Sequence, residues 1–217
     1  MSCISGADNL LLQIHAWQCV DYDPNYIKSF VTFFNITELR KVDKIKQIIN
    51  DIITKFNHSK STLIGYKDDT NIIVLILDDI VIKLYHIDHF NSIKQIIDHP
   101  HTNIETVLSK YELEDIVVIV NEKIIPMLSA KCILNPDISH LTISGENIFH
   151  QISDGLCHIH KSNYIHNDVS LDNIGLKIVK DKIIYVLFDF GASKINYDKE
   201  LFLDEFNKLR SSIMRYL

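Results

Sequence analysis

Residues 164–175 read Y-I-H-N-D-V-S-L-D-N-I-G, and this stretch decides how the rest of the chain is interpreted. Asp168, Asp172 and Asn173 lie close together in a sequence otherwise rich in isoleucine. Residues 144–161, just before them, carry apolar side chains at helical spacing, so we expect the stretch to be a loop after a helix. Each of the three residues alone is typical of a turn, because Asp and Asn side chains readily bond to turn backbone. Their meaning therefore depends on what else the chain carries.

A second polar group, Asp189-Phe190-Gly191, follows a strand that we predict at 183–188. The interval between Asn173 and Asp189 is long enough for a hairpin that brings the two groups together. Carboxylate and amide oxygens are the hard ligands that Mg²⁺ prefers. Asp168 can accept or orient a hydroxyl proton. The two groups together predict metal-assisted chemistry on a phosphate.

These residues resemble two motifs of the protein-kinase superfamily. H-N-D-V-S-L-D-N at 166–173 is similar to the catalytic loop H-R-D-L-x-x-x-N, and residues 189–191 match the D-F-G motif. Val81-Ile82-Lys83 resembles the V-A-I-K motif that lies upstream in the family. Three further resemblances complete the order: D-H-P-H-T-N-I-E at 98–105 to the H-P-N-I stretch after helix αC, 118–127 to the hinge strand, and 144–161 to helix αE. Together they cover about residues 62–204.

The pattern of elements predicts an α+β fold, because strands and helices are segregated along the chain. We expect helices within 8–58 and at 89–97, 144–161 and 199–216, strands at 116–120 and 183–188, and a hairpin from 72–77 and 80–85. The resemblance implies a protein-kinase-like two-lobed fold with a helical N-terminal extension and an abbreviated C-lobe. Its parts would be 1–60 (extension), 61–125 (N-lobe) and 126–217 (C-lobe). Such a short C-terminal part is found in small atypical kinases and in viral or degenerate truncated ones.

The resemblance also implies a role for each matching residue, with ATP and Mg²⁺ (or Mn²⁺) as cofactors. Asp168 would be the catalytic base or hydroxyl-orienting group, and His166 would be structural, beside Phe190. Asp204 resembles the aspartate that braces the catalytic loop. The remaining assignments are Asn173 and Asp189 to the metal ions, Lys83 to the α- and β-phosphates, and Gly65, Ile72 and Glu122 to the nucleotide.

The chain departs from the family pattern at four places. The aligned Gly-rich loop keeps only Gly65, and the helix after Lys83 offers Asp88 where a glutamate is expected. Asn167 replaces the arginine that receives an activation-loop phosphate, so activation by phosphorylation is not expected. Ser170 stands where Ser/Thr kinases carry a lysine.

Three functions therefore stay open. The first is an ATP-dependent protein serine/threonine kinase that transfers the γ-phosphate to a hydroxyl group of a protein substrate. The second is a pseudokinase that binds or regulates a protein partner, which the lost glycines and the missing glutamate favour. The third is a small-molecule kinase of the aminoglycoside or choline type, a class that often lacks the Gly-rich loop.

Composition narrows the partners and the compartment. The formal net charge is −6 and no block of Lys or Arg occurs, so we expect no nucleic-acid partner. The apolar runs are of strand length and the N-terminus lacks a signal-peptide pattern, so we expect no membrane association. The four cysteines form no C-x-x-C pair, which favours a reducing, intracellular (cytoplasmic) location.

Overall fold

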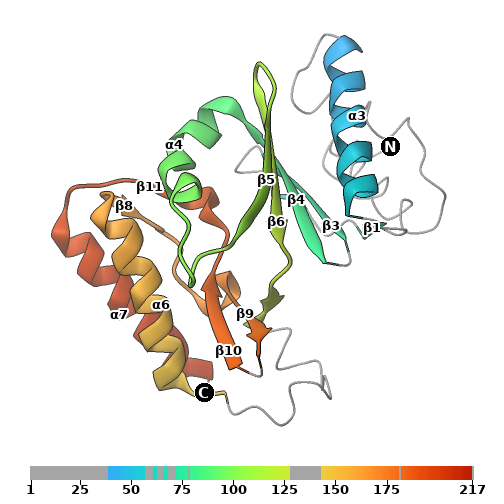
Figure 1. Ribbon diagram of the computed structural model, residues 1–217. Helices are drawn as coiled ribbons and strands as arrows, with labels where there is room; N and C mark the ends of the chain where they lie inside the picture. The colour runs from blue at the N-terminus through green and yellow to red at the C-terminus, as the bar shows by residue number, and fades with distance from the viewer. Residues whose placement is uncertain are drawn as a thin grey trace, which may run out of the picture. The chain divides into compact units, whose positions relative to one another are not determined.

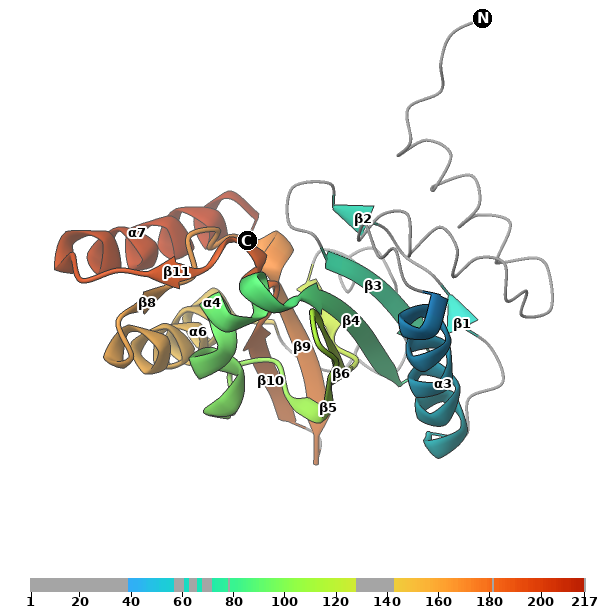
Figure 2. The same cartoon turned by 90° about the horizontal axis from the view of Figure 1, so that it is seen from above.

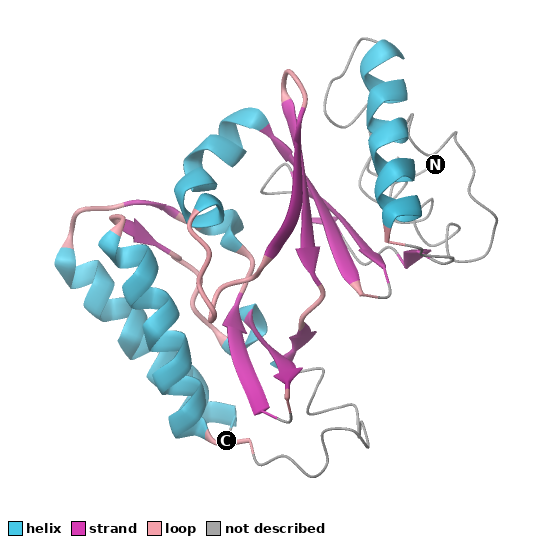
Figure 3. Ribbon diagram, in the orientation of Figure 1, coloured by secondary structure: helices cyan, strands magenta, loops and turns pink. Residues whose placement is uncertain are grey.

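The computed structural model describes residues 39–56, 61–62, 66–67, 72–77, 79–127, 143–180 and 182–216. The helix expected near Leu10 lies outside this part of the chain, as does Gly65, which the resemblance assigns to the nucleotide. Helices combine with antiparallel sheets, so the predicted α+β class is confirmed (Figures 1 and 3). The helices are α3 (Leu39–Lys55), α4 (Ile87–Asp98), α6 (Gly145–Lys161) and α7 (Lys199–Tyr216), with the 3-10 turns η1 (Leu171–Asn173) and η2 (Phe190–Ala192). None of these described helices combines the length and the apolar character needed to cross a bilayer.

The strands in the described part of the chain form three sheets. The largest has the order β1-β3-β4-β6-β5, with β2 also paired to β3; the others are β10-β9-β7 and β11-β8. The strands are β1 (Ser61–Thr62), β2 (Tyr66–Lys67), β3 (Ile72–Leu77), β4 (Ile80–His86), β5 (Val107–Glu112), β6 (Ile116–Glu122), β7 (Ile125–Pro126), β8 (Tyr164–Ile165), β9 (Ile174–Val179), β10 (Lys182–Leu187) and β11 (Lys194–Ile195).

Backbone contacts divide the chain into two compact units. Of the described residues, the first unit contains those up to His89 together with Leu108–Lys123, and the second contains Phe90–Val107 and those from Ile124 onward. The large sheet belongs to the first unit, and the two smaller sheets belong to the second. The domain boundaries expected from the sequence, after residues 60 and 125, stay a prediction.

In the first unit, β3 and β4 form the hairpin that the sequence predicts. The register aligns Ile72 with Tyr85 and Val74 with Lys83. Consecutive Ile, Val and Leu residues favour this pleated arrangement, because branched side chains pack well on a sheet surface. β6 pairs with the other edge of β4 and aligns Ile119 with Lys83. Lys83 therefore lies on a central strand of the sheet.

Helix α3 covers one face of this sheet (Figure 2). Ile45, Ile49 and Ile52 recur at helical spacing and are almost fully buried. Their partners in the core are Leu77, Ile80, Ile82, Leu84, Ile116, Val118 and Val120. Because full burial of one such side chain contributes about 1.5–3 kcal/mol, α3 is part of the core of this unit.

The other face of the sheet carries the residues of β4 and β6 that alternate with those facing α3. Successive side chains of a strand point to opposite faces, so Lys83 and Tyr85 lie opposite the α3-facing residues of β4. On β6 the same rule places Ile119 and Asn121 on the Lys83 face. All four side chains are buried. One charged and one amide group thus lie among apolar neighbours on this face.

In the second unit, α6 and α7 run side by side, and α6 also packs against β10 (Figures 1 and 2). The side chain of Ser144 caps α6 by accepting a hydrogen bond from the Asn147 N–H at 3.4 Å. The predicted apolar face of α6 is confirmed, since Ile148, Ile152, Leu156 and Ile159 are buried. This helix leads through β8 into the polar loop at 166–173.

Strands β9 and β10 form the second hairpin that the sequence predicts. Ile174 is aligned with Leu187 at the open end of the hairpin. The N–H of Phe188 donates to the carbonyl of Asn173 at 3.0 Å, which extends the pairing by one step. The two polar groups noted in the sequence therefore flank the same end of one hairpin.

Candidate active site

Asn173 holds the end of the polar loop through its amide. Its Nδ2 donates to the backbone oxygen of Asp168 at 2.8 Å and to Oδ2 of the same residue at 2.8 Å. Only 5% of Asn173 is exposed, so these bonds fix the amide in one orientation. With both donors of the amide on Asp168, Oδ1 is the atom of Asn173 that can bind a cation. The Asp168 side chain, in turn, is held by a neutral donor.

Asp189 caps the N-terminus of the short turn η2 and has a strained backbone conformation. Its backbone angles are φ 62° and ψ 68°, the left-handed region, which costs a non-glycine residue roughly 1–2 kcal/mol. Its Oδ1 accepts a hydrogen bond from the N–H of Gly191 at 3.4 Å. A second hydrogen bond in this turn runs from the Ser193 N–H to the Phe190 carbonyl at 3.0 Å. Strain of this kind is concentrated at functional sites, where surrounding structure holds it in place.

His166 lies in the interior and supports both the polar loop and the turn of Asp189. It is fully buried, and its Nε2 lies 3.0 Å from the Phe188 carbonyl, so this nitrogen carries the proton. Its ring lies 5.0 Å from the ring of Phe190, so the packing beside Phe190 that the sequence predicts is confirmed. Desolvation by burial lowers the pKa of His166, and the smaller opposing effects come from Phe188, Glu205 and two aspartates. The imidazole is therefore neutral near pH 7.

A buried carboxylate, Glu205 on α7, braces the start of the loop. One oxygen accepts the N–H of Asn167 at 2.6 Å, and the other accepts the N–H of His166 at 3.2 Å. The second oxygen also lies 2.8 Å from Nε2 of His160 on α6. Glu205 thus joins α6, α7 and the loop, and these charge-assisted bonds fix the backbone just before Asp168.

The expectation that Asp204 is the brace was wrong. Asp204 pairs with Lys208 at 2.8 Å, and 47% of its side chain is exposed. Helical phase explains the difference, because Glu205, Leu209 and Ile213 recur at four-residue spacing and form the buried face of α7. Asp204 lies one position off this face. The period of the apolar residues in 199–216 was the signal that could have identified Glu205.

Aromatic rings enclose the histidine that pairs with Glu205. The His160 ring stacks on Phe202 at 4.4 Å between centroids and meets the edge of Phe206 at 5.4 Å. Only 9% of the His160 side chain and 3% of the Glu205 side chain are exposed. A hydrogen bond between ionisable groups is strong where water is excluded. The brace is therefore shielded on the α7 side.

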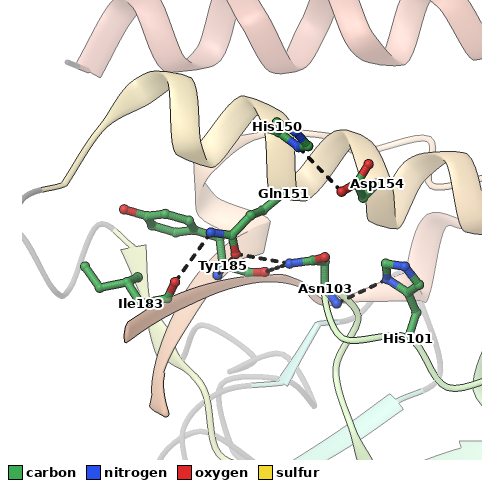
Figure 4. A network of polar contacts seen from close by, with 7 residues as sticks. All are labelled: His101, Asn103, His150, Gln151, Asp154, Ile183 and Tyr185. Atoms are coloured by element: carbon green, nitrogen blue, oxygen red, sulfur yellow. Dashed lines mark hydrogen bonds and ion pairs between the residues drawn. The ribbon is translucent and has the colours of Figure 1, made fainter. Parts of the chain in front are cut away.

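A separate polar network fixes the strand that leads to Asp189 (Figure 4). Asn103 donates through Nδ2 to Oε1 of Gln151 at 3.2 Å and to the carbonyl of Tyr185 at 2.9 Å. The N–H of Tyr185 donates to the same Gln151 oxygen at 2.9 Å. Two backbone bonds continue the contact, because the Leu187 N–H donates to the Asn103 carbonyl and the Glu105 N–H to that of Leu187. β10 is therefore held against α6 and against residues 103–105, up to two residues before Asp189.

The segment after Gly191 is tied back to the loop. The hydroxyl of Ser193 donates to the carbonyl of His166 at 3.3 Å. Strand β11 pairs with β8, and the N–H of Asn196 donates to the Asn163 carbonyl at 2.7 Å. The segment enters α7 through a turn in which the N–H of Asp198 donates to the Asn196 side chain. Its path from Gly191 to α7 is thus held by backbone contacts along the loop.

The first unit carries the other predicted site residues. Lys83 lies on β4 and is 8% exposed, Ile72 is aligned with Tyr85, and Glu122 ends β6 and is half-buried. Asp88 is the second residue of α4, where its side chain is 87% exposed and lies 3.5 Å from Nδ1 of His86. The structure brings Asp168, Asn173 and the turn of Asp189 together within the second unit, while Lys83, Ile72 and Glu122 belong to the first.

The chain is similar, over part of its length, to a protein kinase. A stretch of 76 residues is 36% identical to the serine/threonine-protein kinase ksp1 of Schizosaccharomyces pombe (strain 972 / ATCC 24843). This match covers 31% of the chain and 16% of that kinase, so it spans only a small part of the relative. No family model matches the chain.

Proposed function

We propose that this chain is an ATP-dependent phosphotransferase that transfers the γ-phosphate to a hydroxyl group, with serine or threonine of a protein as the acceptor. The observation that carries the proposal is the pairing of Asp168 with Asn173 at the open end of the β9–β10 hairpin, beside the turn of Asp189. The partial similarity to a serine/threonine kinase supports the choice of acceptor.

The donor set at this end of the hairpin fits a magnesium ion. Asn173 offers Oδ1 once its Nδ2 is bonded to Asp168, and Asp189 offers a carboxylate. Hard oxygen ligands of this kind suit Mg²⁺ and leave positions for phosphate oxygens. A bound Mg²⁺ would neutralise charge on the phosphates. Asn173 and Asp189 are therefore the residues that we assign to the metal.

Asp168 has the chemistry required of the hydroxyl-orienting group. Its Oδ2 accepts from Asn173, which leaves the other carboxylate oxygen to accept the proton of an acceptor hydroxyl. The carboxylate cannot rotate freely, because Asn173 bonds to it and Glu205 holds the backbone of the preceding residue. Positioning of this kind is the main contribution that a protein makes to phosphoryl transfer.

The test is transfer of radiolabelled phosphate from ATP to a serine/threonine peptide library and to the chain itself, with Mg²⁺ or Mn²⁺. We expect Asp168→Asn to lower the rate by about 10²–10⁴-fold, the usual contribution of a positioned acid or base. Asp172→Asn is the matched control, since Asp172 is exposed on the same loop and is expected to keep the wild-type rate. Equal activity of the Asp168 variant and the wild type would refute the proposal.

One observation favours a pseudokinase as the second candidate. Asp88, the residue in the position of the αC glutamate, has an exposed side chain beside His86. A pseudokinase would bind ATP–Mg²⁺ without turnover, and a ligand at a hundred times its Kd raises stability by about 2.7 kcal/mol. A thermal shift with ATP–Mg²⁺ combined with no label transfer would establish this function. Label transfer that depends on Asp168 would exclude it.

A further inference from the structure

Ser212 on α7 caps the short turn η1 from outside the turn. Its hydroxyl oxygen accepts a hydrogen bond from the N–H of Leu171, the first residue of η1, at 3.0 Å. Ser170, which stands at the usual capping position, makes no capping hydrogen bond with its own side chain. Because Leu171 is almost fully buried, its N–H needs a partner within the protein. Helix α7 therefore supplies the cap that the turn does not supply itself.

The capped turn ends in the proposed metal ligand Asn173. The Asn173 N–H donates to the Ser170 carbonyl at 3.1 Å, and the Ile174 N–H donates to the Leu171 carbonyl. These two bonds join the capped residue and Asn173 in a single turn, so a rotation at Leu171 also turns the backbone of Asn173. The cap thus acts on the residue whose Oδ1 we assign to Mg²⁺.

Helix α7 holds the polar loop at two points. Glu205 accepts two N–H groups at the start of the loop, and Ser212 accepts the N–H of Leu171 near its end. Ser212 follows Glu205 by seven residues, which is close to two turns and about 10 Å along the helix axis. Both acceptors therefore lie on the same side of α7, and all these residues belong to the second unit. Asp168 lies between the two points of attachment.

Asn173 has other contacts that do not depend on the cap. Its amide bonds to Asp168, and its carbonyl accepts the N–H of Phe188. Loss of the cap should therefore shift Oδ1 of Asn173 without unfolding the loop. Groups that orient a metal ligand tune the affinity of the site even though they do not touch the ion. We therefore expect the cap to influence metal binding.

We propose that Ser212 is a positioning residue for the metal site, because its hydroxyl holds η1 in the orientation that presents Oδ1 of Asn173. This inference rests on the proposed function. Loss of the hydroxyl should weaken metal binding. Helix α7 itself should not be weakened, because alanine forms helix more readily than serine. A cap that only stabilised the fold would give the opposite pattern, with lower stability and unchanged metal affinity.

The test compares Ser212→Ala with Ser211→Ala in the full chain. Both changes replace serine by alanine on α7, but Ser211 is exposed, and the Leu171 N–H is bonded to its neighbour. Kd for Mn²⁺ alone is measured from the electron paramagnetic resonance signal of the free ion, and hydrogen exchange is measured on the metal-free chain. We expect Ser212→Ala to raise Kd by about fivefold, the effect of one capping hydrogen bond, and to speed exchange at Leu171 and Asn173. Ser211→Ala should leave both measurements unchanged.

Two further measurements separate positioning from a structural role. Ser212→Thr keeps the hydroxyl, so its Kd for Mn²⁺ should stay within about twofold of wild type. In label transfer to the peptide library, Ser212→Ala should raise the Mg²⁺ concentration for half-maximal rate by about fivefold and leave kcat at saturating Mg²⁺ within about twofold.

Equal Kd values for Mn²⁺ in wild type and Ser212→Ala would overturn the inference, whatever the stability of the variant. Equal losses of affinity in Ser212→Ala and Ser211→Ala would overturn it as well, because only the first change removes the cap. In either case, label transfer by the wild-type chain would leave the proposed function standing. A wild-type chain that neither binds Mn²⁺ nor transfers phosphate would refute the proposed function itself, and the inference with it.

Discussion

Replacing Glu205 by alanine should make the chain unfold at a much lower urea concentration. The change removes the carboxylate that accepts both the His166 and the Asn167 N–H groups, and it leaves His160 without that partner. A buried donor left unsatisfied costs about 1–3 kcal/mol, and breaking a buried pair costs about 3–5 kcal/mol. We therefore expect a loss of about 3–5 kcal/mol, or about 2 M in the urea midpoint for an m-value near 2 kcal/mol/M.

Two isosteric variants distinguish the contribution of the Glu205 brace to stability from that of charge on helix α7. Glu205→Gln keeps one acceptor oxygen and loses the charge, so the loss should be about 1–3 kcal/mol. Asp204→Asn, one residue earlier, removes an exposed pair with Lys208 and should cost no more than about 0.5 kcal/mol. The order of the three losses follows directly from burial and the number of acceptor atoms removed.

The assay is urea unfolding at pH 7.5 followed by far-UV circular dichroism. Native-state hydrogen exchange adds a local readout, because the amides of His166 and Asn167 should lose protection in Glu205→Ala. If Glu205→Ala and Asp204→Asn lower the free energy of unfolding by the same amount, the brace does not exist as described. Unchanged protection of both amides would refute it independently.

The other predictions concern the loop, pH and helix α3. Asn173→Ala removes two hydrogen bonds and should cost about 1–3 kcal/mol in urea unfolding, and it should abolish label transfer while the chain stays folded. Burial lowers the pKa of His166 in the folded state, so the unfolded chain takes up the proton first; stability should fall as pH drops below about 6.5. Urea unfolding at pH 7.5, 6.5 and 5.5 measures this slope, and a slope that His166→Asn leaves unchanged would assign it to other groups. Ile52→Ala in α3 should lower the free energy of unfolding by about 2–5 kcal/mol, while the exposed Gln47→Ala should change it by less than about 0.5 kcal/mol. Equal effects of these last two would contradict the packing of α3 on the sheet.

Much of the local structure could be predicted from periodicity. The helix expected at 199–216 has those bounds, and the helix expected at 144–161 begins at Gly145 after its Ser144 cap. Both hairpins were also predicted, because branched residues flank short polar turns. Strand β5 was missed. In this strand Leu108 is exposed and Ser109 is half-buried, so hydropathy does not follow the pleat.

The sequence alone determined helices α6 and α7, the two hairpins and the approach of the Asp168 loop to the turn of Asp189, because these depend on spacing along the chain. Helix and strand periods are local properties, and the interval between Asn173 and Asp189 requires only one hairpin. The tertiary structure decided which carboxylate braces the loop and which glycine admits a neighbouring segment. Both residues contact groups that are distant in the sequence: Glu205 accepts the N–H of His166, and Gly175 packs against Ile124. Burial and close approach arise only when separate elements pack, so these two residues could not be singled out before the fold was known.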